Sequence, residues 1–197
     1  MLPNCVPLQK TCWKLLSDSM TEEIEIIKQQ AIKDYNKKNF ESAIQGFQTC
    51  LTYFENTDDE LSAAEAHNNL SVTYLGMNSA QLAYEEALGT DEIFARSGDL
   101  KRQGMAVANT AAALEALGRK EEALALYEQS LDIFKEIGEK EMRASILRRI
   151  ADLQIKTKRG FQAIASMEAA YDQKEKRPLK DSLFKSILTS IRQKLVK

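Results

Sequence analysis

Side chains that could do chemistry are few in this 197-residue chain. The only histidine is His67, and the cysteines are Cys5, Cys12 and Cys50. Neither set has the spacing of a metal site, and a lone histidine is more often a packed residue than a ligand. The sequence also lacks a glycine-rich phosphate loop, an HExxH motif and a CxxC motif. We therefore expect no catalytic residue, no metal ion and no cofactor, and hence a protein that is not an enzyme.

Polar side chains recur at intervals of forty residues and could bind a peptide. One series is Gln29, Asn69, Asn109 and Arg149, and the series one residue earlier is Lys28, Asn68, Ala108 and Arg148. An Asn or Gln amide both donates and accepts hydrogen bonds, so these side chains can bind a peptide backbone in either direction. Alternatively, they are solvated or bond to neighbouring helices. The elements that carry them decide between these interpretations.

The same forty-residue interval organises most of the chain. Small residues fall in two columns: Ala31, Ser71, Ala111 and Ala151, and then Ala43, Ala83, Ala123 and Ala163. Several matching columns in one ungapped register indicate an internal repeat. Within each unit the apolar spacing is that of two helices, and Gly118 and Gly138 stand where helices would end. We expect helix pairs at about 21–38 with 40–56, 60–77 with 80–97, 100–117 with 120–137, and 140–157 with 160–174.

Stacking of these pairs predicts an all-α solenoid, because one helical hairpin cannot bury its apolar face alone. The alanine columns would let the two helices of a pair approach closely, while larger residues fill the space between pairs. The expected organisation is an N-terminal partial helix or cap at 1–20, four repeats at about 21–57, 58–97, 98–137 and 138–177, and a C-terminal capping helix at 178–197.

The repeat resembles the tetratricopeptide repeat (TPR), a helix-turn-helix unit that stacks into a right-handed superhelix. The resemblance rests on the alanine columns, on the aromatic column that holds Phe47 and Tyr127, and on the phrase from Leu117 to Ala123. A period of 40 is similar to that of the long-repeat branch found in kinesin light chains and the Leu-Gly-Asn-repeat adaptors. The resemblance covers about residues 21–174.

In proteins of this family the first helix of each pair lines a concave groove, in which an extended peptide commonly lies. The resemblance therefore implies a peptide-binding groove here, with the candidate residues Lys28, Gln29, Asn68, Asn69, Asn109, Arg148 and Arg149. It also implies a non-catalytic adaptor for protein–protein interaction. The alternative is a structural or self-associating module, which could be a fragment of a longer array.

The two ends of the chain carry patterns of their own. From Leu179 to Leu195 one apolar stripe is flanked by basic residues, which predicts a helix that caps the last repeat. The alternative is a basic amphipathic helix for membranes or calmodulin. At the other end, Leu8 to Asp18 aligns with Gln48 to Asp58, so residues 1–20 could hold the second helix of an incomplete earlier repeat.

Charge is distributed unevenly although the net charge is only −2. Residues 40–94 contain no Lys or Arg, whereas in residues 96–197 basic side chains outnumber acidic ones by 21 to 14. A stacked array would turn this asymmetry into an acidic and a basic segment. We expect a protein or peptide ligand whose acidic part lies near Arg148 and Arg149, with head-to-tail self-association as an alternative.

Other partners and compartments are disfavoured by the composition. The net charge does not indicate nucleic acid, and no apolar run approaches the roughly 20 residues of a membrane span. The N-terminus lacks the pattern of a secretory signal, and an odd number of cysteines is typical of reduced thiols. We therefore expect a cytoplasmic protein that binds neither nucleic acid nor membrane.

Overall fold

A computed structural model describes the backbone of residues 7–172 and the side chains of residues 20–170. In this part of the chain there are nine α-helices and no strand. Their bounds are α1 (Pro7–Asn36), α2 (Phe40–Asn56), α3 (Glu60–Gly76), α4 (Ala80–Ala87), α5 (Thr90–Ser97), α6 (Leu100–Ala116), α7 (Lys120–Glu136), α8 (Lys140–Lys156) and α9 (Gly160–Asp172). The all-α class is confirmed, whereas the expected capping helix at 178–197 lies outside the described residues.

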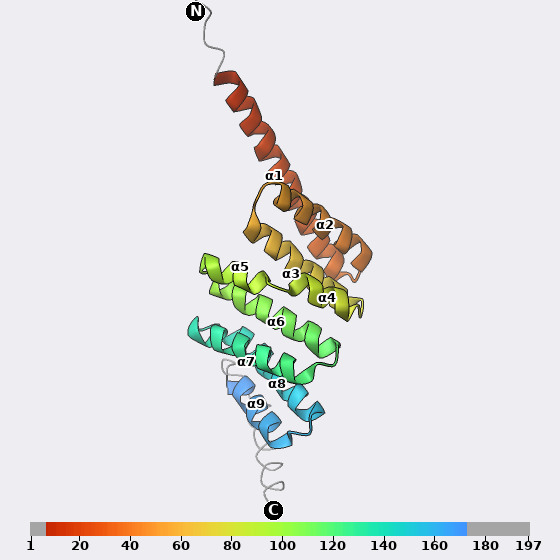
Figure 1. Cartoon of the computed structure of the whole chain (residues 1–197), viewed down its shortest axis with the longest axis vertical. Coiled ribbons are helices and arrows are strands. Elements are labelled where there is room, and N and C mark those ends of the chain that lie inside the picture. Colours follow the sequence, from red (N-terminus) through yellow and green to blue (C-terminus); the bar gives the residue numbers. More distant parts are fainter. Residues whose placement is uncertain (1–6, 173–197) are drawn as a thin grey trace, which may run out of the picture.

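The helices form a stack of hairpins. The first helices are α1, α3, α6 and α8, and each packs against a second helix, namely α2, α4 with α5, α7 and α9. Figure 1 shows these pairs following one another down the long axis of the molecule, in the order of the sequence. The TPR-like solenoid expected from the forty-residue interval is confirmed.

The connections between helices share one backbone device. After α1, for example, Lys38 has a φ of +64°, and the N–H of Asn39 donates to the carbonyl of Asp34 at 2.9 Å. The same five-residue reach recurs from Arg119 to Leu114, next to Gly118. A residue in the left-handed region closes the helix and satisfies one of its last carbonyl groups. The short connections therefore return each second helix alongside the first.

The small residues lie where the paired helices touch. Both alanine-rich columns are buried in every pair: Ala31, Ser71, Ala111 and Ala151 on the first helices, and Ala43, Ala83, Ala123 and Ala163 on the second helices. Ser71 replaces alanine without leaving a buried hydroxyl unpaired, because its Oγ donates to the backbone oxygen of Ala83 at 2.7 Å. Larger residues, including Tyr127 and Phe134, fill the core around these contacts.

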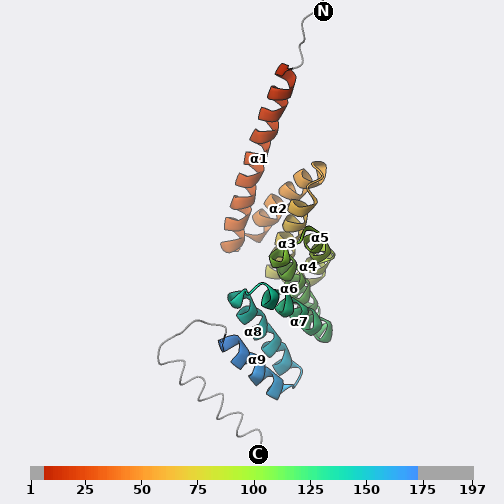
Figure 2. The same ribbon diagram turned by 90° about the vertical axis from the view of Figure 1, so that its left-hand side faces the viewer.

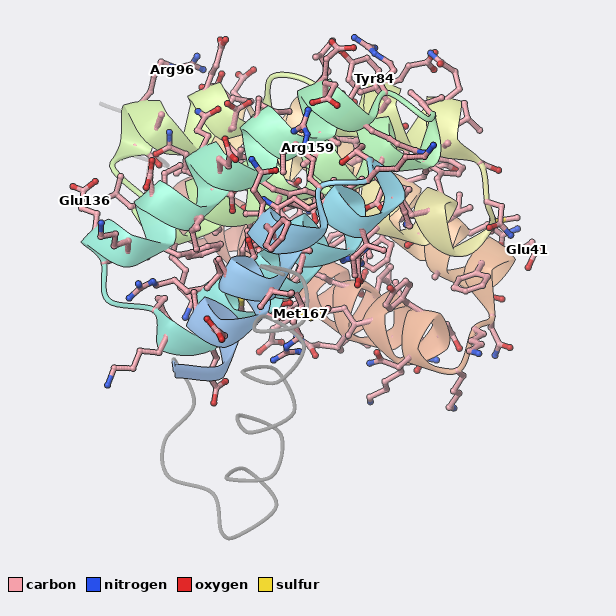
Figure 3. All side chains as sticks on the ribbon, turned by 90° about the horizontal axis from the view of Figure 1, so that it is seen from below. Glu41, Tyr84, Arg96, Glu136, Arg159 and Met167 are labelled. Carbon is pink, nitrogen blue, oxygen red and sulfur yellow. The ribbon has the colours of Figure 1, made fainter. Side chains whose placement is uncertain are left out.

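Ion pairs join one helix pair to the next along the surface. Lys101 of α6 bonds to Glu139, which precedes α8, with 2.7 Å between Nζ and Oε1. Arg159, labelled in Figure 3, donates from the connection before α9 to Glu121 of α7 at 2.8 Å. These side chains are between about a third and two thirds exposed, so each pair contributes little to stability.

The N-terminal helix differs from the expectation. Residues 1–20 were expected to hold a partial helix or cap and the first helix of the first pair to begin near residue 21, but Pro7–Asn36 form a single helix of 30 residues. No glycine or proline stands between Leu8 and Asn36 to end it. Figure 2 shows that α1 extends well beyond the end of α2, so Leu8 to Asp18 lie on the same continuous helix as the first helix of the first pair.

The second helix of the second pair also differs, because residues 80–97 were expected to be one helix. The chain breaks at Leu88 and Gly89, where Gly89 has a φ of +79°. The hydroxyl of Thr90 then donates to the backbone oxygen of Ala87 at 2.8 Å and holds the two short helices together. Gln48 and Thr49 occupy the equivalent positions of α2, which continues without a break.

Candidate peptide-binding groove

A hollow of about 510 Å³ lies among the first helices α1, α3 and α6. Its lining comprises Ile32, Tyr35, Asn36, Phe47, Glu65, Asn68, Asn69, Val72, Phe94, Arg102, Met105 and Asn109, which we call the groove. Phe47 and Phe94 reach it from second helices and are almost fully buried. The groove therefore has an apolar floor, with four amide side chains and one pair of opposite charges among its walls.

Asn68 is the central polar residue of the groove. It is 9% exposed, and its Nδ2 donates to the backbone oxygen of Ala64, one turn earlier on α3, at 3.2 Å. Its Oδ1 accepts a hydrogen bond from Asn109 Nδ2 at 3.1 Å. Two of the expected peptide-binding residues are thus bonded to each other across α3 and α6. This bond holds the Asn109 side chain in place at the groove wall.

Asn69 is half-buried beside Asn68 and also lines the groove. Only its backbone oxygen takes part in a side-chain contact, as the acceptor for Thr73 Oγ1 at 2.7 Å. Among the residues whose side chains are described, none hydrogen-bonds to the Asn69 amide. That amide can therefore donate to and accept from a ligand.

Lys28 and Gln29 do not line the groove. Gln29 is exposed and donates to Glu25 on the same helix at 2.8 Å. Lys28 pairs with Glu25 at 3.0 Å and with Glu65 of α3 at 3.6 Å. Partial burial by itself would lower the pKa of Lys28, but the hydrogen bond to Glu25 and the two carboxylate charges outweigh it, and the pKa is raised. Lys28 is therefore a cation held beside the groove.

Glu65 connects three first helices at one end of the groove. Besides Lys28 of α1, it meets Arg102 of α6, with 3.6 Å between Oε2 and Nη1. Arg102 is also held by Asp99 at 2.7 Å, and its guanidinium lies 5.0 Å from the centre of the Phe94 ring. This end of the groove is consequently lined by charges that already have partners.

Arg148 and Arg149 lie on α8 and are exposed, outside the groove lining. Arg149 is 3.7 Å from Glu115 of α6, a carboxylate that Lys156 approaches more closely, at 2.8 Å. Arg148 makes no ion pair with any residue from 20 to 170. Because α8 is the first helix of the next pair after α6, the two arginines stand on the first helix that follows the groove.

Several groove residues were not anticipated from the sequence, chiefly the apolar ones. Ile32 and Val72 lie three residues after Gln29 and Asn69, and Met105 lies four residues before Asn109. On a helix such positions share one face with the amides. That spacing could have indicated the apolar lining residues. In the structure Met105 is 42% exposed, although it is a large apolar residue.

The other chemically distinctive residues are packed ones. His67 of α3 is half-buried, and its Nδ1 lies 2.7 Å from Glu86 Oε2 of α4. Cys50 is fully buried, and its thiol donates to the backbone oxygen of Ile24 at 3.7 Å. Within the described residues there is no cluster of His, Cys, Asp or Glu that could hold a metal ion. Nor is any helix in this part of the chain long and apolar enough to cross a membrane.

Comparison with known proteins identifies a family and a fold. Residues 8–194 match the family model described as soluble NSF attachment protein, SNAP. No curated protein matches the sequence.

Among solved structures, a Rap protein complexed with competence and sporulation factor is 17% identical, with a TM-score of 0.68 over 77% of this chain and 43% of that one. BtubC (BKLC) from P. vanneervenii is 17% identical, with a TM-score of 0.66 over 79% of this chain and 63% of that one. Aspartyl phosphate phosphatase F from Bacillus subtilis is 10% identical, with a TM-score of 0.69 over 77% of this chain and 41% of that one. This chain thus spans less than two thirds of each structure, and at these identities the likeness shows a shared fold.

Proposed function

This chain belongs to the soluble NSF attachment protein family, and from that premise we propose that it is a non-catalytic adaptor that binds a segment of a partner protein in the groove. The observation that carries the proposal is the combination of an apolar hollow with amides on its wall. A volume of about 510 Å³ falls in the range of ordinary ligand sites. A groove of this kind can seat an apolar side chain and bond to the backbone beside it.

The side chains of the groove divide between these two tasks. Ile32, Val72 and Met105 offer apolar surface to a side chain of the partner. Asn69 and Asn109 stand on adjacent first helices and can bond to the polar backbone that would otherwise lose its hydrogen bonds to water. An extended segment that crosses from α3 to α6 meets both kinds of surface.

An acidic part of the partner fits the end of the array beyond α6. Arg148 and Arg149 are exposed on α8, and Arg148 has no anionic partner among residues 20–170. At the opposite end, Lys28 and Arg102 already share Glu65. A bound segment would therefore be oriented with its acidic residues toward α8.

The similar proteins support binding more than catalysis. The family is described as an attachment protein for NSF, and the Rap protein was solved in complex with competence and sporulation factor. Aspartyl phosphate phosphatase F bears the name of an enzyme, but it shares only the fold with this chain.

Substitution of the two groove amides tests the proposal. The wild-type chain is used to isolate a partner from native lysate, and the purified partner is then titrated by calorimetry against Asn69→Ala with Asn109→Ala. Each lost hydrogen bond is worth about 0.5–1.5 kcal/mol, so we expect affinity to fall by about five- to 150-fold. Circular dichroism should show unchanged helicity.

A matched control removes two amides from the second helices. Gln48 of α2 and Gln129 of α7 are exposed, so Gln48→Ala with Gln129→Ala should leave affinity unchanged. A folded groove variant that binds the partner as tightly as the wild type would contradict the proposal. The alternative of a self-associating module is tested by measuring the molar mass of the chain without a partner. A mass that rises with protein concentration would favour self-association.

A further inference from the structure

We propose that Asn109 presents its side-chain oxygen, and not its NH₂ group, to the ligand, so that the groove selects a hydrogen-bond donor such as a peptide N–H at this point. The inference rests on the proposed function, since it concerns how the groove reads a bound segment. It follows from the bonding of Asn68, which fixes the orientation of the neighbouring amide.

The backbone oxygen of Ala64 provides the starting point. A carbonyl oxygen can only accept a hydrogen bond, so the Asn68 atom 3.2 Å from it must be the nitrogen Nδ2. The reverse orientation would place two oxygens face to face at a residue that is only 9% exposed. Burial therefore makes that orientation unfavourable and leaves Asn68 Oδ1 directed away from Ala64.

The orientation of Asn109 follows from that of Asn68. Because Asn68 Oδ1 is an acceptor, the Asn109 atom 3.1 Å from it must be the donor Nδ2. The remaining polar atom of Asn109 is then its Oδ1. Among residues 20–170 no donor hydrogen-bonds to that oxygen, although Asn109 lines the groove. An acceptor is thus available to a ligand at this position.

The Thr90 hydroxyl also lies near Asn68 and supports the assigned orientation of the two asparagine amides. Its Oγ1 is 2.8 Å from the backbone oxygen of Ala87 but 3.5 Å from Asn68 Oδ1. A hydroxyl has one proton to give, and the shorter contact takes it. Asn68 Oδ1 therefore depends on Asn109 for its short hydrogen bond, which holds the Asn109 amide in one orientation.

Among residues 20–170 this bond between two asparagines occurs only between α3 and α6. In the third pair, Ala108 occupies the position equivalent to Asn68 and offers no side-chain oxygen to the next first helix. Asn69, by contrast, has no such neighbour and can present either end of its amide. Asn109 is consequently the position at which the groove distinguishes a donor from an acceptor. A proline or an N-methylated residue facing it would lack the required N–H.

Two small probes that differ in their N–H groups test this inference. One is N-acetylleucine N-methylamide, which has two amide N–H donors and an apolar side chain for the groove. The other is N-acetyl-N-methylleucine dimethylamide, which keeps the side chain but has no N–H. Each is titrated into the ¹⁵N-labelled full chain, and the backbone and side-chain amide resonances of Asn109 and the backbone amide resonance of Met105 are followed.

We expect the donor-bearing probe to bind about two- to tenfold more tightly than the methylated one, as loss of a hydrogen bond predicts. In Asn68→Ala the Asn109 amide is free to turn, so this preference should fall toward one, whereas Gln48→Ala should retain it. In the free wild type one proton of the Asn109 NH₂ group should exchange slowly with water.

Equal binding of the two probes would overturn the inference while leaving the groove as a binding site, so the proposed function would stand. Absence of any shift at Asn109 with either probe, or rapid exchange of both its NH₂ protons, would also overturn it. Failure of the proposed function is recognised separately, by undiminished partner binding in the variant that lacks both groove amides.

Discussion

Gly46 of α2 lies so close to Ala31 of α1 that a Cβ atom built at position 46 would come within 2.7 Å of the Ala31 Cβ. Carbon atoms in a packed core prefer separations of about 3.5–4.0 Å. The close approach of the first helix pair therefore depends on a hydrogen at position 46 as well as on the alanines at 31 and 43.

Replacement of this glycine should destabilise the first pair. In Gly46→Ala the added methyl group must push α1 and α2 apart, and overpacking of this kind costs about 1–3 kcal/mol. Thermal denaturation should show a fall of several degrees. Gly160→Ala is the control, because a Cβ at position 160 would meet no atom within 4 Å. Equal melting of the two variants would contradict the close contact.

The third pair offers an independent test of the same packing. Ala111 is fully buried in a core cluster that also holds Ala123 and Tyr127. Ala111→Leu adds three carbons there, and we expect a loss of about 1–3 kcal/mol and a lower melting temperature. Lys120 is exposed, so Lys120→Ala should change little. If Ala111→Leu melts like the wild type, the assignment of this column to the helix contact is wrong.

Two lysines at helix ends should be replaceable with a gain in stability. Lys38 and Lys158 have φ values of +64° and +61°, in a region that costs a residue with a Cβ about 1–2 kcal/mol and glycine little. Allowing for the greater freedom of glycine in the unfolded chain, Lys38→Gly and Lys158→Gly should each add about 0.5–1 kcal/mol. Thermal melts measure this. Lys33→Gly, inside α1, should have the opposite sign.

The sequence was a good guide to the repeat and to the face of each helix. A forty-residue interval placed Asn69 and Asn109 on equivalent positions of successive first helices, and both line the groove. The interval could not show how far the lining of the groove extends. Lys28 shares a column with Asn68, yet it turns to Glu25 and Glu65. Such pairing depends on which helices meet in space, and that is not visible in the interval.

The break between α4 and α5 shows a second limit. Gly46 and Gly104 lie within continuous helices, whereas Gly89 takes a φ of +79° and ends one. A glycine inside a helical pattern is compatible with either outcome. The two helical glycines lie at close helix contacts, because Gly46 and Gly104 face Ala31 and Phe134, while a Cβ at Gly89 would meet nothing within 4 Å. Such neighbours come from other helices and are not visible in the local sequence.

Acid should weaken α6 through Asp99, the N-cap residue that precedes it. The backbone N–H of Arg102 donates to Asp99 at 2.8 Å, and this bond, with the Arg102 side chain, lowers the pKa of Asp99. A lowered pKa means that the carboxylate stabilises the fold above about pH 4 and that this stabilisation is lost as the pH falls through the lower, folded-state pKa.

Asp99→Asn isolates this contribution because it keeps the capping oxygen but does not titrate. Urea denaturation at pH 7 and at pH 3 should show a smaller loss of stability on acidification in the variant than in the wild type. Asp132→Asn, a substitution on α7, is the control and should match the wild-type loss. A variant Asp99→Asn with the full wild-type loss would show that Asp99 does not carry this dependence.

The orientation of a bound segment can be tested by charge reversal on α8. Arg148→Glu with Arg149→Glu should lower the affinity for the isolated partner by about two- to thirtyfold at low salt, since each exposed pair is worth about 0.2–1 kcal/mol. Wild-type affinity should itself fall as salt rises, because the Debye length is about 10 Å at 0.1 M and shorter above it.

The control for this reversal introduces the same change of charge on a second helix. Lys120 and Lys135 are exposed on α7, so Lys120→Glu with Lys135→Glu alters the net charge equally but at a distance from the groove. If only the α8 variant weakens binding, the acidic part of the partner lies beside α8. Equal weakening by both would indicate a general effect of net charge, and unchanged binding by both would mean that the arginines do not contact the partner.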